Sequence, residues 1–501
     1  MRFTLFLFLT FIITAIQAQN NSFSPHSNNV SNSISFTGNI RGPFQITDTI
    51  SVIFRRDYLS HLEGAEILRV HPKYDGSFEF GFSNVDHPAT MLLGYYIDGH
   101  YYDLGDYFVE PGDKIHILLN GNKNEYHLSP SFEGEGVAKY NCRLEIDKIK
   151  GQFDELRKST PIRKLDDLDG YRKLIDSGQV MINSALIKYK NILSASMYNL
   201  MAAEFSTYVP TIWLMEIGHY YRHRAKSETE KQKVIKFYKK PLSVLPLHNS
   251  NISALSKNYV LYLQSKFTLD LFIANNGKGY EYKKLYSVLK KNTNGLLREK
   301  LLMLFFLSIA LDTRDLVNYK PSDFDECLRD ALKYIKTPYI QEALNNSFSV
   351  YKRGTEAFPF SFVNTQGGTV NLKDLKGKTI LLDVWFTNCL GCLDLGKKLH
   401  EDIYPEFKKD SSFVILSIST DEKKETWLKS LNSGKYSQPE FINVYTGGVG
   451  FYEHPLIKHY NIQGAPWSII IDKNGRVFCK ISYVDKSDNI KKWIKEALGQ
   501  N

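Results

Sequence analysis

The 501-residue sequence has only five cysteines, far too few for a fold held together mainly by disulfide bonds. Beyond its first 18 residues it has no uninterrupted run of about 18 apolar residues, so we expect no membrane-spanning helix there. It also lacks the low hydrophobicity of disordered proteins, because 43% of its residues are hydrophobic and 13% aromatic. A chain of this length therefore folds around ordinary hydrophobic cores, and we expect two or three of them.

Strong local charge is also missing. The formal net charge is +9, but the basic residues form only short runs, such as Arg222, Arg224 and Lys226. We interpret them as part of a solvated basic surface and expect no nucleic-acid partner.

Residues 1–18 have the layout of a secretory signal peptide: Arg2 near the start, an apolar run from Phe3 to Ile13, and small and polar residues up to Ala18. We therefore expect export of a soluble mature protein, or a membrane tether if the signal stays uncleaved. No cysteine follows the expected cleavage site, which argues against a lipid anchor. Residues 19–33 are rich in Asn and Ser and predict a flexible linker.

The next two regions differ in their hydrophobic period. Residues 34–130 contain short alternating runs separated by turns, which predict a small β-sandwich. Residues 131–350 carry apolar residues at three- and four-residue spacing, which predicts an all-α helical domain. Four prolines should mark breaks or kinks in its helices: Pro210, Pro241, Pro246 and Pro321.

Residues 355–501 alternate between strand and helix patterns. We expect strands over 379–386, 412–418 and 441–445, with helices between them. A terminal hairpin around Lys473-Asn474-Gly475 should precede a last helix over 489–498. This order predicts an α/β domain, with a mixed sheet flanked by helices.

Cys389-Leu390-Gly391-Cys392 directly follows a predicted buried strand and opens a helix. The free amide groups and the dipole at a helix N-terminus stabilise a thiolate at Cys389. Cys392 lies one turn further on, within reach for a disulfide. Cys389 would attack a substrate disulfide and Cys392 would resolve the mixed disulfide, or the reverse sequence would donate one.

Other interpretations of the cysteines stay open at this point. The pair could be half of a zinc site, although no second pair exists to complete four ligands, or a purely structural disulfide. Cys142, Cys327 and Cys479 are scattered, and small buried apolar side chains are the simplest interpretation. A bridge between Cys142 and Cys327 is an alternative.

Asp383 lies six residues before Cys389 on the predicted buried strand. An isolated buried carboxylate is unfavourable, and burial raises its pKa. We therefore expect Asp383 to relay a proton to or from Cys392. The alternative is a carboxyl group satisfied by backbone or water. Trp385 should pack beneath the cysteines.

The segment Asp383-Val-Trp-Phe-Thr-Asn-Cys389-Leu-Gly-Cys392 resembles the thioredoxin active site, and Gly464-Ala-Pro466 is similar to the cis-proline strand of that fold. The resemblance implies that Pro466 is cis and faces the disulfide, and that the backbone at Ala465 pairs with a bound substrate chain. The site residues that we expect fall into two groups. The catalytic ones are Cys389, Cys392, Asp383 and Pro466, and the substrate-binding ones are Ala465, Trp467, Trp385, Leu390 and Gly391.

The entry hairpin, with Phe360-Ser-Phe-Val, Gly367-Gly-Thr-Val and Leu375-Lys-Gly-Lys378, looks like the redoxin (AhpC/TSA) group, and together with the site it resembles the TlpA-like envelope oxidoreductases. The β-sandwich followed by helices is similar to the front half of many such proteins from Bacteroidota. We hypothesise that the chain exchanges disulfides with protein thiols in the periplasm in the reducing direction, with these proteins and a membrane electron donor as partners. The resemblance implies no cofactor beyond the redox-active disulfide and no metal.

The sequence departs from the family pattern at several positions. Asn388 replaces a tryptophan, Gly391 a proline inside the pair, and Trp467 a threonine after the cis-proline. These changes leave the roles intact but affect the reduction potential. Leu395 stands where cytochrome-maturation members have a glutamate, which argues against that substrate.

Two rival functions remain. A peroxiredoxin needs Thr three residues before its reactive cysteine, and Phe386 is there instead. The other rival is an envelope binding or scaffold protein whose redox domain is accessory. His219 and His223 are four residues apart and could hold a metal, but a cationic helix end is the simpler interpretation.

Overall fold

The computed structural model describes residues 32–41, 49–56, 65–97, 100–122, 125–240, 251–307, 316–449, 454–460, 462, 464–482 and 485–499. The expected signal peptide and nearly all of the linker lie outside these residues, as do Pro241 and Pro246. Among the helices of the described residues, none is both long and apolar enough to cross a membrane.

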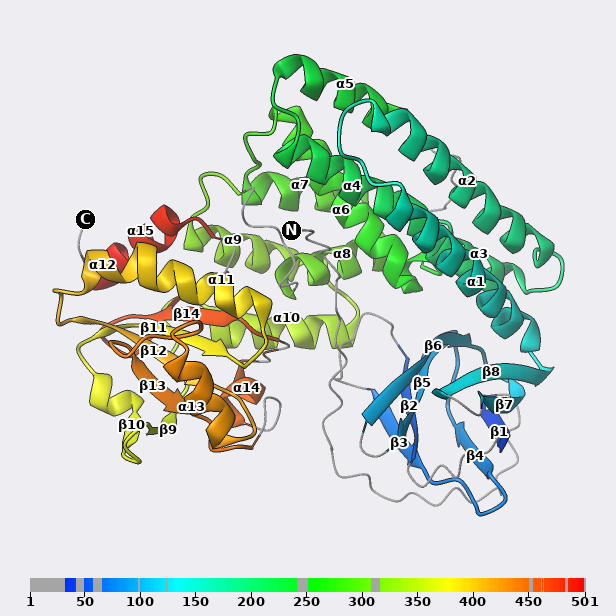
Figure 1. Ribbon diagram of the computed structural model, residues 1–501, viewed down its shortest axis with the longest axis horizontal. Helices are drawn as coiled ribbons and strands as arrows, with labels where there is room; N and C mark the ends of the chain where they lie inside the picture. Colours follow the sequence, from blue (N-terminus) through cyan, green and yellow to red (C-terminus); the bar gives the residue numbers. More distant parts are fainter. Residues whose placement is uncertain are drawn as a thin grey trace. The chain divides into compact units, whose positions relative to one another are not determined.

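The N-terminal strands form two antiparallel-rich sheets, which Figure 1 shows in blue and cyan. One sheet has the order β4 (Ser77–Phe82), β1 (Ile34–Arg41), β7 (Lys114–Asn122), β8 (Glu125–Glu135). The other has the order β3 (Glu66–Val70), β2 (Ile50–Arg55), β5 (Ala89–Ile97), β6 (His100–Val109). Both sheets contribute to one core, in which Phe54 of β2 stacks on Phe82 of β4 with ring centroids 4.1 Å apart. The predicted β-sandwich is confirmed.

The middle of the chain is helical, as the period predicted. Its helices are α1 (Val137–Ser159), α2 (Asp167–Lys188), α3 (Ala195–Phe205), α4 (Tyr208–His223), α5 (Glu228–Lys239), α6 (Lys257–Ala274), α7 (Tyr282–Asn292), α8 (Gly295–Leu307), α9 (Pro321–Ala331) and α10 (Pro338–Tyr351). Pro210 lies in the first turn of α4, just after the break between α3 and α4, and Pro321 is the first residue of α9. Both positions tolerate proline because the first-turn N–H groups have no partner within the helix.

The chain divides into two compact units. Among the described residues, one unit runs up to Ile273 and includes Thr293–Lys300, and the other takes Ala274–Asn292 and the residues from Leu301 onward. The last helices join the C-terminal unit because their aromatic residues pack into it: Tyr319, before α9, contacts Trp493, and Tyr351 at the end of α10 contacts Trp467.

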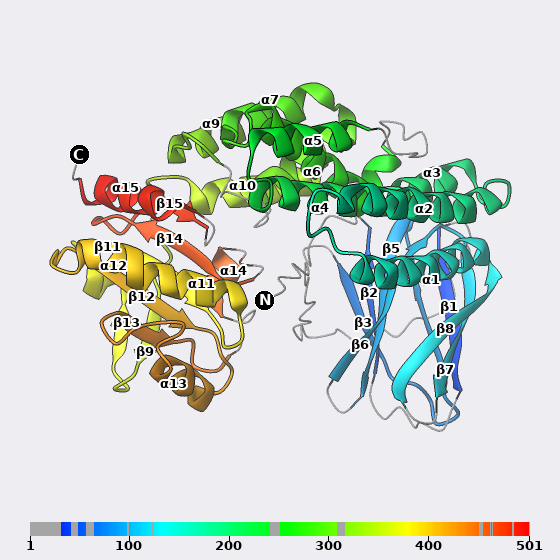
Figure 2. The same cartoon turned by 45° about the horizontal axis from the view of Figure 1, so that its top comes forward.

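The C-terminal unit contains a seven-stranded sheet with the order β10 (Thr369–Asn371), β9 (Ser361–Asn364), β13 (Ile442–Tyr445), β12 (Phe413–Ser419), β11 (Thr379–Trp385), β14 (Trp467–Ile471), β15 (Val477–Ile481). Strands β11, β12 and β13 are parallel, and the other pairs are antiparallel. The predicted mixed α/β sheet is therefore confirmed. Figure 2 shows it in yellow to red, with β11 among the inner strands.

Helices accompany this sheet: α11 (Leu390–Lys398), which continues through a π-helical turn (Leu399–Ile403) into α12 (Tyr404–Phe407), then α13 (Lys424–Asn432), α14 (Pro455–His459) and α15 (Ser487–Leu498). Leu395 of α11 and Trp493 of α15 pack with Leu381 in one core, while Leu456 of α14 packs with Leu382 in another. The two cores lie on opposite faces of the sheet because successive strand side chains alternate between faces.

Because side chains alternate along β11, the two faces of the sheet present different residues to the site. Every residue of β11 is buried. Leu382 and Val384 share a core with Trp467 and Ile469 of β14. Asp383 therefore projects from the other face, as its neighbour Ser468 does in the paired strand, where the two residues are directly opposite.

Candidate active site

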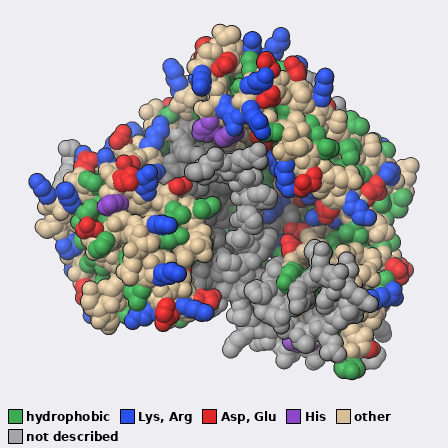
Figure 3. Space-filling view, viewed as in Figure 1, with side chains coloured by type: hydrophobic (Ala, Val, Ile, Leu, Met, Phe, Trp, Pro, Cys, Tyr) green, Lys and Arg blue, Asp and Glu red, His purple; other side chains and the backbone are tan. Residues whose placement is uncertain are grey.

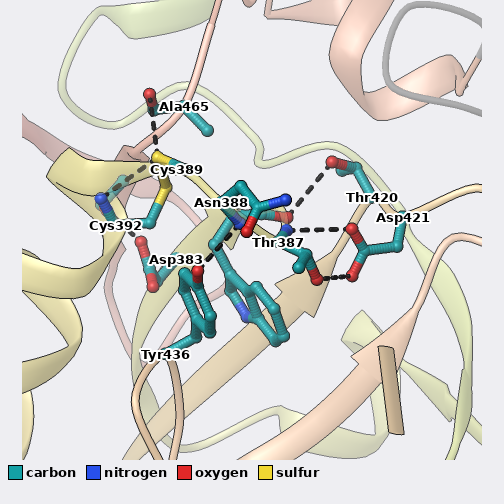
Figure 4. The surroundings of a disulfide bond; sticks show 11 residues. Asp383, Thr387, Asn388, Cys389, Cys392, Thr420, Asp421, Tyr436 and Ala465 are labelled. Atoms are coloured by element: carbon teal, nitrogen blue, oxygen red, sulfur yellow. Dashed lines mark hydrogen bonds between the residues drawn. A yellow bond between two sulfur atoms is a disulfide. The ribbon is translucent and has the colours of Figure 1, made fainter. Parts of the chain in front are cut away.

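Cys389 and Cys392 form a disulfide bond, with the sulfur atoms 2.06 Å and the Cα atoms 5.2 Å apart (Figure 4). Cys389 is the N-cap residue of α11, and its Sγ accepts a 3.1 Å hydrogen bond from the backbone N–H of Cys392. The expected pairing at the start of a helix is confirmed. The same N–H and the helix dipole would stabilise negative charge on the Cys389 sulfur after reduction.

The two cysteines are not equally accessible. Cys389 is 6% exposed and Cys392 is 2% exposed, while Leu390 between them is 75% exposed. Cys389 is thus the more accessible of the two sulfur-bearing residues, and both pack in one cluster with Trp385 and Tyr436. This geometry fits attack by Cys389 and resolution by Cys392.

Asp383 is a carboxyl group in the interior, 2% exposed. Burial raises its pKa to about 7, and a 2.9 Å hydrogen bond donated by the Ser468 hydroxyl opposes part of that rise. Asp383 and Trp385 are two residues apart on β11, so both side chains project from the face on which Cys392 packs. In Figure 4 the Asp383 carboxyl group is drawn on the Cys392 side of the disulfide. A group with this pKa can both give and take a proton near neutral pH.

Trp385 forms the floor of the site. Its side chain is fully buried, its Nε1–H donates a 2.7 Å hydrogen bond to Ser417 Oγ on β12, and its ring stacks on Tyr436 at 5.1 Å between centroids. With its indole N–H satisfied and its ring covered, Trp385 supports the site by packing. It has no exposed surface for substrate binding, so that expected role is replaced by a supporting one.

Two residues that we did not single out from the sequence hold the loop before Cys389. The Asp421 carboxylate accepts hydrogen bonds from the Thr387 N–H at 2.9 Å and from the Thr387 hydroxyl at 2.8 Å. The Tyr436 hydroxyl accepts a 2.8 Å bond from the N–H of Asn388, whose φ is +71°. Figure 4 shows both contacts. Asp421 stands just after β12, the parallel neighbour of β11. This position is the sequence feature that could have identified it as a site residue.

The Ala465–Pro466 peptide bond is cis, as the resemblance implies. The carbonyl oxygen of Ala465 lies 3.5 Å from the Cys389 Sγ, so this segment faces the disulfide. In the reduced protein the Cys389 thiol can donate a hydrogen bond to this oxygen. Pro466 is buried and Ala465 is half-buried.

Trp467 occupies a different place from the one that we expected. Its ring is 3% exposed and belongs to the core that contains Leu382 and Leu456, on the sheet face opposite Asp383. It therefore offers no side-chain surface to a substrate, because the strand alternation turns it away. Of the expected substrate-binding residues, Leu390, Gly391 and Ala465 are at least partly exposed around the disulfide.

The remaining cysteines are free and buried: Cys142, Cys327 and Cys479. The bridge between Cys142 and Cys327 that the sequence left open is therefore absent. Burial raises the pKa of Cys142 and of Cys327 to about 12, which makes both thiols unreactive at neutral pH.

Metal-ligating side chains do not gather elsewhere in the described part of the chain. The rings of His219 and His223 lie 4.8 Å apart on α4, but no group of three or more His, Cys, Asp or Glu side chains that could hold a metal ion occurs among the described residues. Figure 3 shows Lys and Arg side chains interspersed with Asp and Glu over the described part of one face.

Residues 377–477 match a family described as thioredoxin-like. The thiol-disulfide oxidoreductase ResA of Bacillus cereus is 31% identical over 128 residues, which are 26% of this chain and 68% of that protein. ResA of Bacillus thuringiensis is 28% identical over 144 residues, 28% of this chain and 77% of that protein. Among solved structures, the thioredoxin domain of a thiol-disulfide oxidoreductase from Bacteroides vulgatus is 28% identical, with a TM-score of 0.25, and the match covers 28% of this chain and 97% of that one.

Proposed function

This chain belongs to the thioredoxin-like thiol–disulfide oxidoreductases, and from that premise we propose that it reduces disulfide bonds of exported proteins in the periplasm. Its activity as a thiol–disulfide oxidoreductase resides in the C-terminal unit. The observation that carries the proposal is the Cys389–Cys392 pair at the start of α11, above a buried carboxyl group whose pKa is about 7.

The reaction begins with the reduced dithiol. The Cys389 thiolate attacks one sulfur of a substrate disulfide, an S–S bond forms between Cys389 and the substrate, and the other substrate sulfur leaves as a thiolate that takes up a proton. The Cys392 thiol then loses its proton and attacks Cys389, which releases the second substrate thiol. The substrate gains two electrons and two protons, and the protein is left with the Cys389–Cys392 disulfide.

Asp383 supplies the proton step in this proposal. Cys392 is 2% exposed, so water is a poor base for its thiol. A carboxylate with a pKa of about 7 is about half ionised at neutral pH and can accept the Cys392 proton as that sulfur attacks. In the reverse reaction the protonated carboxyl group returns it.

The start of α11 stabilises a Cys389 thiolate, but two other features of its surroundings oppose that charge and support the reducing direction. Reduction potentials rise when the reduced form of the pair is strongly stabilised as a thiolate. Here the Ala465 carbonyl oxygen lies 3.5 Å from the sulfur, where it interacts favourably with a thiol and unfavourably with a thiolate. The aromatic cluster with Trp385 and Tyr436 also disfavours charge. The oxidised pair must then be reduced again, and we propose a membrane protein as the electron donor.

Export is supported by the signal-like pattern of residues 1–18. Fractionation of cells and N-terminal sequencing of the mature protein test this part. Recovery in the periplasmic fraction with an N-terminus near Gln19 is expected, and recovery in the cytoplasm with Met1 intact would contradict it.

The direction of exchange is tested by equilibrating the full chain with glutathione redox buffers and measuring the fraction of Cys389–Cys392 disulfide. A potential below about −200 mV supports a reductant, whereas a value near about −120 mV is that of strong disulfide donors and contradicts it. Cys392→Ser is the matched control, because it keeps Cys389 but cannot form the couple.

A further inference from the structure

Trp467 directly follows the Ala465–Pro466 segment that faces Cys389, yet its own side chain points into the core on the opposite face of the sheet. The indole Nε1–H is its only polar group, and it donates a 3.2 Å hydrogen bond to the hydroxyl of Tyr351. A buried indole N–H that loses its partner is destabilising, so this bond helps to hold the first residue of β14 in place, together with its pairing to Val384 and its core packing.

The Tyr351 hydroxyl is engaged twice. It accepts the bond from Trp467 and donates one to the backbone carbonyl of Tyr460, just after α14. One hydroxyl can serve both contacts because it carries one donor and two acceptor sites. Burial raises the pKa of Tyr351 above its ordinary value, so the hydroxyl keeps its proton across the range in which thiol exchange occurs.

The three aromatic rings pack on one another. The ring centroids of Tyr351 and Tyr460 are 5.7 Å apart, those of Tyr351 and Trp467 are 6.3 Å apart, and those of Tyr460 and Trp467 are 5.0 Å apart. The ammonium group of Lys480 on β15 lies 5.3 Å from the centroid of the Tyr351 ring. Tyr351, the last residue of α10, is thereby held against β14 and β15 of the seven-stranded sheet.

Tyr351 lies before residues 377–477, the segment that matches the thioredoxin-like family. Its partners, Tyr460 and Trp467, lie inside that segment. The hydrogen bond from Trp467 therefore connects the strand beside the disulfide to a helix that the family match does not include.

We propose that Tyr351 is a positioning residue for thiol–disulfide exchange, which holds Trp467 and through it the Ala465–Pro466 segment opposite Cys389. The inference rests on the proposed exchange at Cys389, in which the reduced chain reduces a disulfide. A polypeptide substrate needs the Ala465 backbone at a fixed place in order to pair with it, whereas a small disulfide needs only the Cys389 sulfur.

The test compares two probes with the reduced full chain: insulin, whose disulfides lie in polypeptide, and the small disulfide dithiobis(nitrobenzoate). Tyr351→Phe keeps the ring and removes only the hydroxyl. We expect its rate with insulin to fall about three- to tenfold, the range for loss of one neutral hydrogen bond, and its rate with the small disulfide to stay within about twofold.

Tyr460→Phe is the matched control. Its hydroxyl accepts a 3.0 Å bond from the Phe358 N–H and does not touch the indole nitrogen, so it loses a buried bond in the same cluster. We expect a similar fall in melting temperature in both variants but a changed ratio of insulin to small-disulfide rates only in Tyr351→Phe. Equal ratios in the two variants would overturn the positioning role.

Trp467→Phe removes the donor of the same bond and serves as the second variant. The double variant with Tyr351→Phe should lose less insulin activity than the product of the two single effects, because both changes break one interaction. Independent effects would overturn the link. A wild-type chain that reduces neither probe would overturn exchange itself and the inference with it, whereas an active wild type with an unchanged Tyr351→Phe would overturn the inference alone.

Discussion

The Ser468 hydroxyl donates a 2.9 Å hydrogen bond to the Asp383 carboxylate from the directly opposite position on the neighbouring strand. Among the hydrogen bonds of the described residues, this is the one that lowers the pKa of Asp383, against a larger rise from burial that brings it to about 7. The pair thus sets the pH at which the site changes its protonation state.

Replacing Asp383 by Asn should remove an ionisation from the exchange reaction. We expect the wild-type rate of mixed-disulfide resolution to rise with pH through an inflection near 7, since the carboxylate is the base for Cys392. Asp383→Asn should lose the inflection and slow resolution by about a hundredfold at pH 7, within the range of general-base effects. Stopped-flow measurement between pH 5 and about pH 9 checks this, and an unchanged profile would rule out Asp383 as the base.

Replacing Ser468 by Ala should shift that inflection upward. The variant keeps the carboxyl group but removes the hydrogen bond that favours its charged form. The same kinetic profile measures the shift. Ser417→Ala is a suitable control. Ser417 lies on β12, the other neighbour of β11, and its hydroxyl accepts a hydrogen bond from the Trp385 indole. A downward shift in Ser468→Ala would contradict the account.

Asp383 should also reduce the stability of the folded protein at neutral pH. Its folded pKa of about 7 is raised above the ordinary value of 3.8, so between these values the unfolded chain has released the proton while the folded chain still holds it. Stability contributed by this group is therefore full below about pH 4 and is lost as pH rises to about 7.

Asp383→Asn should consequently gain stability relative to wild type as pH rises. The gain is at most about 4 kcal/mol, which is the pKa shift from 3.8 to about 7 multiplied by about 1.4 kcal/mol per pKa unit. It is reduced because the buried Asn amide must itself be hydrogen-bonded. Urea unfolding of the oxidised proteins at pH 4 and at pH 8 measures it. A difference that shrinks with rising pH would contradict the raised pKa.

Asp421 should matter for both stability and exchange. Its carboxylate is 9% exposed and accepts bonds from the Thr387 N–H, the Thr387 hydroxyl and the Ser419 hydroxyl. Asp421→Ala removes the acceptor of all three bonds, and the Thr387 N–H loses its carboxylate partner, so we expect a loss of about 2–4 kcal/mol in the free energy of unfolding. Because Thr387 stands two residues before Cys389, exchange should slow as well.

Ser430→Ala is the control for Asp421, since the Ser430 hydroxyl contacts only the hydroxyl of Thr387 in this network. It should destabilise the protein by about 1 kcal/mol or less. Equal losses in the two variants, measured by chemical unfolding, would show that the carboxylate has no special role in holding the loop.

Some residues of this site can be predicted from the sequence and others cannot, for a physical reason. Cys389, Cys392 and Asp383 lie within ten residues on one strand and the following helix, so local spacing suffices to place them together. Tyr436 and Tyr351 reach the site only through tertiary packing, which spacing does not encode, and the sequence signal for Asp421 is its position just after the strand that neighbours β11. Trp467 was misassigned because its place beside the proline was considered without the alternation that turns its side chain away.

The fold follows the same rule. Hydrophobic period predicts the sandwich, the helices and the mixed sheet because each depends on local repetition. Period does not show where helices pack: α9 and α10 have the pattern of the preceding helices, yet Tyr319, just before α9, contacts Trp493 of α15, and Tyr351 of α10 contacts Trp467 of β14.

Thiol labelling separates the redox pair from the other cysteines. In the folded, reduced protein only Cys389 combines a helix N-cap position with access beside the exposed Leu390. Burial raises the pKa of Cys142 and of Cys327 to about 12, so less than about one in ten thousand of these thiols is ionised at pH 7.5. Iodoacetamide should therefore modify Cys389 fast and the others only after unfolding.

Mass spectrometry of tryptic peptides over a time course measures this order. Cys389→Ser should abolish the fast phase, and oxidation of the wild type to the disulfide should abolish it equally, because the reactive sulfur is then bonded to Cys392. If instead Cys142 or Cys327 were labelled at the rate of Cys389 in the folded chain, their thiols would have to be accessible and ionised, and the burial that makes them inert in this fold would be wrong.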